Sequence, residues 1–327
     1  TRRQRQMCIR DRAYTPQDSA LFGSFECPEE VDIPLTDIEA YKLWPNLNWI
    51  YDKPKLCESL KVKHNFSGIM PEEFPVFQKP IQNLHGRGQN TKLISNPKEF
   101  EKSYMPGTFW MPAYTGNHWS VDVIMLNGKV ADYFCVLGHP SFDGMFDYWE
   151  YKGRVDENIG KYDEHMLQAS IKATDFCEKH LQDYGWSGVI NFELIGENII
   201  EVHLRMSPQF AVMYGEAVLK QLPDVYAGNK YKKDPMKQTP PGGYVLPMFV
   251  EEAPKHGFEV NDKKIKEVLD DENVRHVSFE YTGENNLEDI AHPPGGFYLG
   301  SITVTNLDKG REQRKELFKA FVPRDIH

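Results

Sequence analysis

Alternating apolar and polar side chains in the middle of the chain predict a set of antiparallel strands. The predicted strands are 76–79, 92–95, 109–114, 120–126, 130–136, 189–195 and 198–204. Asn127-Gly128 joins two of them and is typical of a tight hairpin turn. The last two strands form a second hairpin, which turns around Glu197.

Apolar positions three and four residues apart predict helices between these strands. The longest helix is expected over 161–183, ending before Gly185. Asp52 and Asn96 are expected to act as N-caps, because each stands just before a helical stretch with proline in its first turn. The shorter helices are expected over 54–60, 97–104 and 209–222. Residues 138–160 are expected to form a long loop rich in aromatic side chains.

This mixed order of helices and antiparallel hairpins predicts an α+β fold rather than a doubly wound parallel sheet. Residues 1–25 begin with a basic head that has no apolar core, and we expect them to be a disordered or expression-derived tail. A short N-terminal region is expected at 26–70 and a core at 71–227. A smaller C-terminal α+β section is expected at 228–327.

Composition narrows the class of protein. The chain has 327 residues, of which 40% are hydrophobic and 13% aromatic, too many for a disordered chain. Its net charge of -10 opposes binding to nucleic acid, and no apolar run approaches the ~18–20 residues that cross a membrane. The five cysteines are scattered without a C-x-x-C pair, which favours reduced thiols and a cytoplasmic protein.

The hairpin at 189–204 carries the first candidate chemistry. Asn191 and Glu193 share one face of its first strand, and Glu201, His203 and Arg205 share one face of the second. The turn places Glu193 about opposite Glu201, and two facing carboxylates destabilise a ladder unless a cation separates them. A divalent metal ion would separate them; a solvated polar face is the alternative.

A second cluster lies at the end of the strand 76–79. Lys79 is followed by a glycine-containing loop that includes His85, Gly86, Arg87 and Gly88. Backbone amides of such a loop, together with the Lys and Arg charges, suit a triphosphate. A plain surface hairpin is the alternative, since the spacing matches neither the P-loop nor the dinucleotide-binding motif.

The order of these clusters resembles the ATP-grasp superfamily, of the carboxylate–amine ligase type, over about residues 40–222. The resemblance implies two α+β subdomains that clasp ATP, with a truncated N-terminal domain and a small C-terminal α+β section. It implies that Lys79 contacts the ATP phosphates, assisted by Lys53, and that the His85–Gly88 loop closes over them. The adenine would meet the hinge at Met111 and Tyr114, and the ribose would meet His118, where the family has Glu.

The family's late E-x-N-x-R motif corresponds to Glu201-Val-His203-Leu-Arg205. The resemblance implies a site for Mg²⁺, with Mn²⁺ as the alternative, held by Asn191, Glu193, Glu201 and His203. Arg205, together with Lys79, would carry the catalysis by holding a substrate carboxylate or stabilising developing charge. His203 departs from the family's Asn, and magnesium prefers oxygen ligands.

Three further residues are candidates for the substrate site. Tyr148 and Trp149 would wall an acceptor pocket, with ordinary packing as the alternative. Asp122 leaves an apolar strand and would bind an amine, with a structural carboxylate as the alternative.

The resemblance implies an enzyme: an ATP-dependent ligase that forms a carbon–nitrogen bond between a small-molecule carboxylate and an amine through an acyl-phosphate. The alternatives are an ATP-binding protein without ligase activity, or a small-molecule kinase on the same scaffold. We expect neither a nucleic acid nor a membrane partner, and a homodimer stays open.

Overall fold

The protein is described by a computed structural model. The structure describes residues 15–16, 27–82, 84, 88, 90–141, 145–154, 163–233, 242–281 and 296–324.

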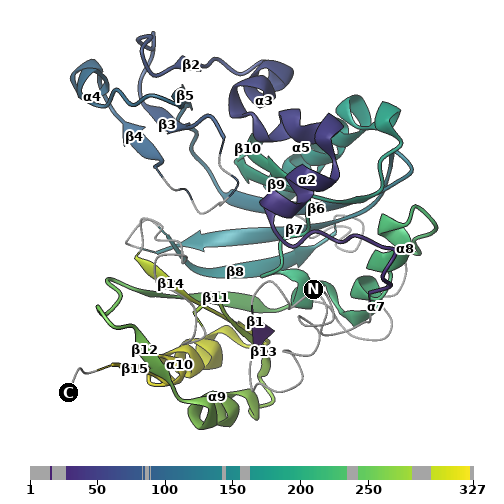
Figure 1. Cartoon of the computed structure of the whole chain (residues 1–327), viewed down its shortest axis with the longest axis vertical. Helices are drawn as coiled ribbons and strands as arrows, with labels where there is room; N and C mark the ends of the chain where they lie inside the picture. The colour runs from purple at the N-terminus through teal and green to yellow at the C-terminus, as the bar shows by residue number, and fades with distance from the viewer. Residues whose placement is uncertain are drawn as a thin grey trace.

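A nine-stranded sheet forms the centre of the molecule, with a four-stranded sheet at one end (Figure 1). Its strands are β1 (Thr15–Pro16), β13 (Val274–Phe279), β14 (Phe297–Val304), β11 (Tyr244–Val250), β8 (Phe146–Gly153), β7 (Lys129–Pro140), β6 (His118–Leu126), β9 (Gly188–Ile195) and β10 (Asn198–His203), in that spatial order. All neighbours are antiparallel except β1 and β13.

The four-stranded sheet lies apart from the large one in sequence order and in space. Its strands, in spatial order, are β2 (Asn65–Phe66), β5 (Thr108–Pro112), β3 (Val76–Pro80) and β4 (Lys92–Ile94). Helix α4 (Pro97–Lys102) packs against one face through Phe100, with Asn96 as its N-cap. A third, two-stranded sheet pairs β12 (Phe258–Val260) with β15 (Phe321–Pro323).

Most of the remaining helices pack on the large sheet, while α3 (Lys53–Leu60) lies beside the four-stranded sheet (Figure 1). The others are α2 (Asp37–Leu43), the 3₁₀ helix η2 (Pro45–Tyr51), α5 (Glu164–His180), the 3₁₀ helix η4 (Gln182–Tyr184), α6 (Ala211–Tyr214), α7 (Glu216–Leu219), α8 (Leu222–Tyr226), α9 (Asp262–Leu269) and α10 (Leu307–Phe318). None of the helices in the described ranges is both long and apolar enough to span a bilayer.

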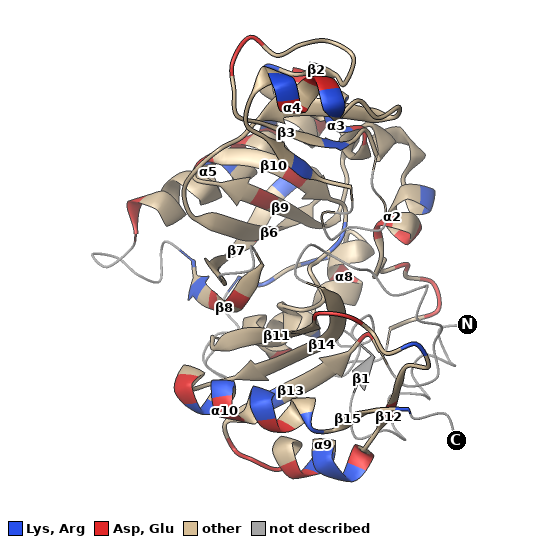
Figure 2. Ribbon diagram, turned by 90° about the vertical axis from the view of Figure 1, so that its left-hand side faces the viewer, with Lys and Arg blue, Asp and Glu red and all other residues tan. Residues whose placement is uncertain are grey.

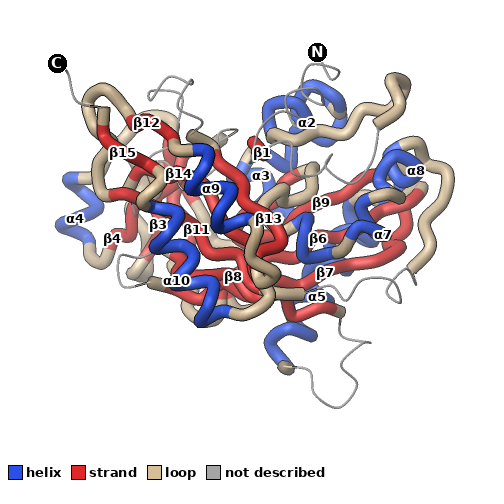
Figure 3. The backbone as a smooth tube through the Cα atoms, turned by 90° about the horizontal axis from the view of Figure 1, so that it is seen from below, coloured by secondary structure: helices blue, strands red, loops and turns tan. Residues whose placement is uncertain are grey.

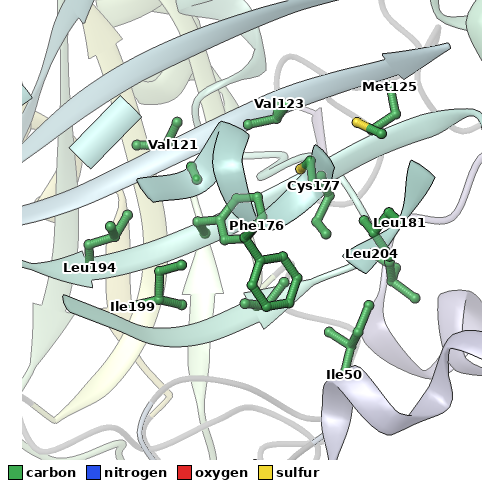
Figure 4. Close-up of a cluster of buried hydrophobic side chains, with 14 of the residues drawn as sticks. Ile50, Val121, Val123, Met125, Phe176, Cys177, Leu181, Leu194, Ile199 and Leu204 are labelled. Carbon is green, nitrogen blue, oxygen red and sulfur yellow. The ribbon is translucent and has the colours of Figure 1, made fainter. Parts of the chain in front are cut away.

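Helix α5 supplies the main core on one face of β6, β9 and β10. Its apolar positions Phe176 and Cys177 are buried against Val121 and Leu194 of the sheet, and Ile50 of η2 closes the same core (Figure 4). Since burial of each large apolar side chain contributes roughly 1.5–3 kcal/mol, this packing holds the three strands in place. The opposite face of these strands is therefore free to carry polar groups.

The C-terminal section extends the large sheet instead of standing apart from it. Strands β11, β13 and β14 continue the sheet beyond β8, and α9 and α10 cover one of their faces (Figure 3). Most charged residues of α9 and α10 are exposed, and both helices lie at the end of the molecule away from the four-stranded sheet (Figure 2). Arg311 and Arg314 of α10 turn inward instead and pair with Asp147 of β8.

Most predicted elements are confirmed, with three differences. Residues 146–153, expected within a loop, form strand β8, because β7 and β11 pair with it on both sides. The helix expected over 209–222 is broken into α6, α7 and α8, and Gly215 at the first break has a positive φ of 89°. Thr15–Pro16, expected within an unstructured tail, pair with β13.

Candidate active site

A stripe of polar side chains crosses three strands on the sheet face opposite α5. Ser120 and Asp122 come from β6, Asn191 and Glu193 from β9, and Glu201 and His203 from β10. The register pairs Glu193 with both Ser120 and Glu201, and Asn191 with both Asp122 and His203. The predicted hairpin pairing is confirmed, because the strand period of two puts these residues on one face.

A β-bulge interrupts this alternation next to Glu201. The register shifts between Ile199 and Glu201, so Ile200 is the extra residue. Ile200 packs against Met111 of the four-stranded sheet instead of the core beneath α5. The bulge therefore directs both Ile200 and Glu201 toward the small sheet.

Two lysines approach the stripe from the four-stranded side. Lys53, the first residue of α3, places its Nζ 3.0 Å from Glu201 Oε1. Asp52 caps this helix by accepting from the Lys55 amide, and the Lys53 amide donates to Ile81 O, which ties α3 to the end of β3. Lys79 lies on β3 itself and is 6% exposed.

The surroundings of Lys79 lower the pKa of its ammonium group. Burial and, after it, the nearby charge of Lys53 lower the pKa of Lys79 to about 8, although Glu201 and Glu193 act in the opposite direction. A buried cation without a close anion is costly, so this lysine is poised to gain from an incoming anion.

Glu193 sits between two histidines. Its carboxylate oxygens lie 3.6 Å from His118 Nε2 and 3.8 Å from His203 Nε2. Burial alone would raise the pKa of Glu193, but His118, His203 and Lys79 together hold it well below its usual range. Glu193 is therefore a carboxylate, and 37% of its side chain remains exposed.

Asp37, at the first turn of α2, binds the other end of the stripe. Its Oδ2 lies 3.0 Å from both His203 Nδ1 and Arg205 Nη2, and Tyr51 OH donates to its Oδ1 at 3.4 Å. Burial would raise the pKa of Asp37, but Arg205 and His203 hold it far below its usual range. Burial would likewise lower the pKa of His203, and Asp37 raises it instead.

Sequence reasoning missed Asp37 and Tyr51. The segment Thr36-Asp37-Ile-Glu39 has the pattern of a capped helix start, in which an acid in the first turn needs no further explanation. Nothing in its spacing points to His203, which is 166 positions away.

The polar side chains of the stripe fit a divalent ion that takes most of its ligands from water and from substrate phosphates. No group of three His, Cys, Asp or Glu side chains is arranged for a metal ion in the described ranges. Asn191 Nδ2 donates to Ser120 Oγ at 2.8 Å and His203 Nδ1 lies 3.0 Å from Asp37 Oδ2, so as metal ligands these two residues would use Asn191 Oδ1 and His203 Nε2. Glu193 and Glu201 supply the carboxylates of the stripe, and Mg²⁺ typically uses one or two carboxylates together with substrate phosphates.

The fold of the chain is similar to that of several solved structures. A carboxyaminoimidazole ribonucleotide synthase from Aspergillus clavatus, complexed with ATP, matches with a TM-score of 0.59 at 15% identity, covering 87% of this chain and 78% of that one. An L-amino acid ligase from Bacillus licheniformis matches with a TM-score of 0.55 at 13% identity, covering 90% and 75%. A biotin carboxylase from Campylobacter jejuni matches with a TM-score of 0.55 at 13% identity, covering 88% and 72%.

The chain has the ATP-grasp fold. The α+β architecture expected from the sequence is thereby confirmed. No protein-family model matches the sequence, and no curated protein matches it either.

The remaining predicted residues occupy different parts of this ATP-grasp fold. Met111 is buried between the sheets, and the half-buried Tyr114 packs against the same apolar cluster as Ile200. Gly88 has a φ of 61°, which favours glycine. Three further loop residues of the predicted phosphate site, His85, Gly86 and Arg87, lie outside the described residues.

The two aromatic candidates for an acceptor wall point to opposite faces of β8. Trp149 lies 5.5 Å from the His118 ring, centroid to centroid, and so borders the polar stripe. Tyr148 stacks on His139 at 4.1 Å and meets Tyr244 of the C-terminal section. Because neighbours on a strand alternate faces, only one of the two can border the stripe, and for Tyr148 the structure supports the packing alternative.

Asp122 is a fully buried member of the stripe. Its carboxylate accepts from Tyr214 OH at 2.5 Å and from the Ser207 amide at 3.2 Å. Burial raises its pKa to about 6 despite the opposing effect of these hydrogen bonds. With 0% exposure and its oxygens occupied, Asp122 matches the structural alternative rather than an amine site.

Proposed function

We propose that this protein is an ATP-dependent ligase that joins a small-molecule carboxylate to an amine. The observation that carries the proposal is the meeting of Lys53 and Lys79 with Glu193 and Glu201 between the two sheets of an ATP-grasp fold. The two lysines belong to the four-stranded side and the two carboxylates to the nine-stranded side. A ligand that fills this position would be bound by both.

The named relatives give the proposal its reaction class. One is a synthase complexed with ATP, and another is an L-amino acid ligase. Their identity to this chain is 15% and 13%, so the acid and the amine are not transferred from them.

The site's own residues suggest a division of labour. Lys79 and Lys53 would bind the nucleotide phosphates, since ammonium groups in a poorly solvated site attract anions strongly. Met111, Tyr114 and Ile200 would offer apolar contact to the base, and His118 a polar contact to the ribose. Glu201 and Glu193 would hold magnesium, which when bound neutralises phosphate charge and orients the transferred group.

The chemistry balances with ATP and the two substrates alone. An oxygen of the substrate carboxylate attacks the γ-phosphorus, and ADP leaves with the electrons of the broken P–O bond. The amine nitrogen then attacks the acyl carbon, phosphate leaves with that carboxylate oxygen, and the nitrogen loses a proton. The apolar surroundings of Met111 and Ile200 would help to exclude water from the activated acid.

A second candidate function is an ATP-binding protein without ligase activity. The engagement of Arg205 and His203 by Asp37 favours it, because both side chains then have a protein partner where a ligase would need them for a ligand. A kinase on the same scaffold has no specific observation in its favour.

Oxygen transfer distinguishes these functions. The protein is incubated with ATP, magnesium and mixtures of amines with carboxylates labelled with ¹⁸O, and released phosphate is analysed by mass spectrometry. A ligase moves one labelled oxygen into inorganic phosphate and requires both substrates. ATP binding without ADP release under any mixture would contradict the ligase proposal, and label-free phosphate on an acceptor would indicate a kinase.

A further inference from the structure

The side-chain carboxylate of Asp37 is surrounded by the kinds of groups that would bind the carboxylate of a ligand. Its oxygens meet a guanidinium, an imidazole and a phenol, from Arg205, His203 and Tyr51, at 3.0, 3.0 and 3.4 Å. These donors are the groups that proteins use to recognise carboxylates, and the Arg205 contact is charge-assisted. Asp37 is 2% exposed, so water does not compete for it.

Helix α2 does not need this carboxylate. Thr36 Oγ1 accepts from the Glu39 amide, and Glu39 Oε2 accepts from the Thr36 amide, so a capping box already completes the start of the helix. The Leu35 amide is also bonded to Glu39. The Asp37 side chain is thus left to turn away from its own helix and toward β10.

The donors that hold Asp37 are themselves fixed independently. Tyr51 OH accepts from the Leu204 amide at 3.0 Å, which anchors it to the chain just after β10. Arg205 Nη1 donates to Met206 O at 3.5 Å, and its buried Nε has no hydrogen-bond partner within the described part of the protein, which leaves it available to a ligand. Removal of Asp37 would therefore leave a preformed set of donors instead of a collapsed one.

The same donors adjoin the carboxylate pair. His203 binds Asp37 through Nδ1 and faces Glu193 through Nε2 at 3.8 Å. Asp37 and Glu193 are thus separated by a single imidazole ring. The position of Asp37 lies directly beside the proposed reaction site.

We propose that Asp37 is a specificity-determining residue that fills, from within the chain, the carboxylate-binding position formed by Arg205, His203 and Tyr51. The proposal rests on the ligase function proposed above and sharpens its substrate class. Asp37 would repel a co-substrate that carries, besides its reacting group, a second carboxylate directed at Arg205. A co-substrate with a neutral amine or hydroxyl at that position would be accepted. Arg205 then acts through its remaining donors instead of as the site for an anionic group.

Small carboxylates test the proposal without nucleotide or turnover. Formate and acetate are titrated into wild type and Asp37→Ala at constant ionic strength, and the melting temperature is followed, with chloride as the reference anion. We expect a saturable rise in the melting temperature of Asp37→Ala and none in wild type, since a ligand that binds the folded state stabilises it by mass action.

Three variants separate a vacated anion position from general loosening. Asp37→Asn removes the charge but keeps the volume, and it should show no response to formate. Asp37→Ala/Arg205→Gln should lose the response of the single variant. Phe176→Ala loosens the buried core beneath α5 without leaving a cation unpaired, and should not respond to formate.

Two results would overturn the proposal. One is a saturable formate response in wild type that disappears in Arg205→Gln, because Arg205 would then be open to carboxylates. The other is a response of Asp37→Ala that persists without Arg205. If Asp37→Ala does not fold, calorimetric titration of formate into wild type and Arg205→Gln still decides between the first result and the proposal.

The two proposals can fail separately. If labelled oxygen never reaches phosphate but formate rescues Asp37→Ala, the ligase function is wrong and the internal carboxylate position stands. If oxygen transfer occurs but formate binds wild type at Arg205, the function stands and the specificity assignment is wrong.

Discussion

Two buried networks in this protein share an aspartate, an arginine and a tyrosine, one of them also includes His203, and they differ in how the arginine reaches the aspartate. Asp132, Arg154 and Tyr231 form one of them, and Asp37, Arg205 and Tyr51 form the other. Arg154 donates Nε and Nη2 to separate oxygens of Asp132 at 2.7 and 2.5 Å, whereas Arg205 reaches Asp37 through Nη2 alone.

The difference shows in the pKa values of the two aspartates. Burial raises the pKa of Asp132, and the hydrogen bonds from Arg154 and Tyr231 only partly offset it. For Asp37, Arg205 and His203 outweigh burial, and the pKa falls. The Asp132–Arg154 pair is thus a structural link with both arginine donors used. The Asp37–Arg205 pair leaves arginine donors over, and we interpret it as a position that could hold an anion.

The largest effect is expected from Asp132→Ala. Removing one partner of a buried pair leaves Arg154 uncompensated, and we expect a loss of roughly 3–5 kcal/mol in the free energy of unfolding. Urea denaturation measures it. Nucleotide affinity should stay unchanged, since the structure links Asp132 to Arg154 and Tyr231 and not to the polar stripe.

The control is Asp308→Ala. Asp308 is 94% exposed and lies 3.7 Å from Arg311, so its removal should change stability by no more than about 1 kcal/mol. Equal losses for the two variants would mean that burial does not distinguish the pairs.

Glu201→Gln should reduce turnover by at least about a hundredfold, the size of effect seen when a group that stabilises transition-state charge is removed. Gln keeps the volume but cannot pair with Lys53 or bind magnesium as an anion. The ADP-release rate and the unfolding curve are measured together, and the variant is expected to stay folded.

Glu197→Gln is the matched control on the same hairpin. Glu197 is 58% exposed at the turn, 3.7 Å from Lys172, and should leave turnover unchanged. If Glu201→Gln is as active as Glu197→Gln, the assignment of Glu201 to the metal is wrong.

Nucleotide affinity should fall by up to about tenfold per pH unit above the pKa of Lys79. The pKa of about 8 means that the charge is present below pH 8 and is lost above it, so phosphate binding weakens as pH rises. Stability moves the other way: the unfolded chain holds the proton up to its ordinary value of 10.5, so this group's contribution to unfolding free energy increases from pH 8 to 10.5.

Titration with a fluorescent ATP analogue between pH 7 and 9 measures the affinity. Lys79→Arg should flatten the profile, because guanidinium keeps its charge over this range. An equally steep profile in Lys79→Arg would assign the pH dependence to another group.

The smallest effect is expected from His118→Ala, which should weaken ATP binding about fivefold, the loss of one hydrogen bond of roughly 1 kcal/mol. His139→Ala is the control variant. His139 also lies beside a carboxylate, with Nε2 2.9 Å from Glu150, but it stacks on Tyr148, which points to the face of β8 away from the stripe. Equal weakening by both variants would remove His118 from the nucleotide site.

Local patterns predicted much of the fold. Asp52 and Asn96 cap helices as expected, and Asn127-Gly128 turns the hairpin between β6 and β7. These features depend on neighbours within a few residues, so the sequence contains their cause. Strand β8 escaped prediction: β7 directly precedes it, but its other partner, β11, is brought to it only by the tertiary structure.

The sequence by itself determined which side chains share the polar face: the period of a strand and the length of the turn place Glu193 opposite Glu201. Only the tertiary structure decided what those side chains meet. Lys53 reaches Glu201 across 148 positions of sequence, and Asp37 reaches His203 across 166. No local pattern encodes such meetings, because they depend on how α2, α3 and the four-stranded sheet pack against β10.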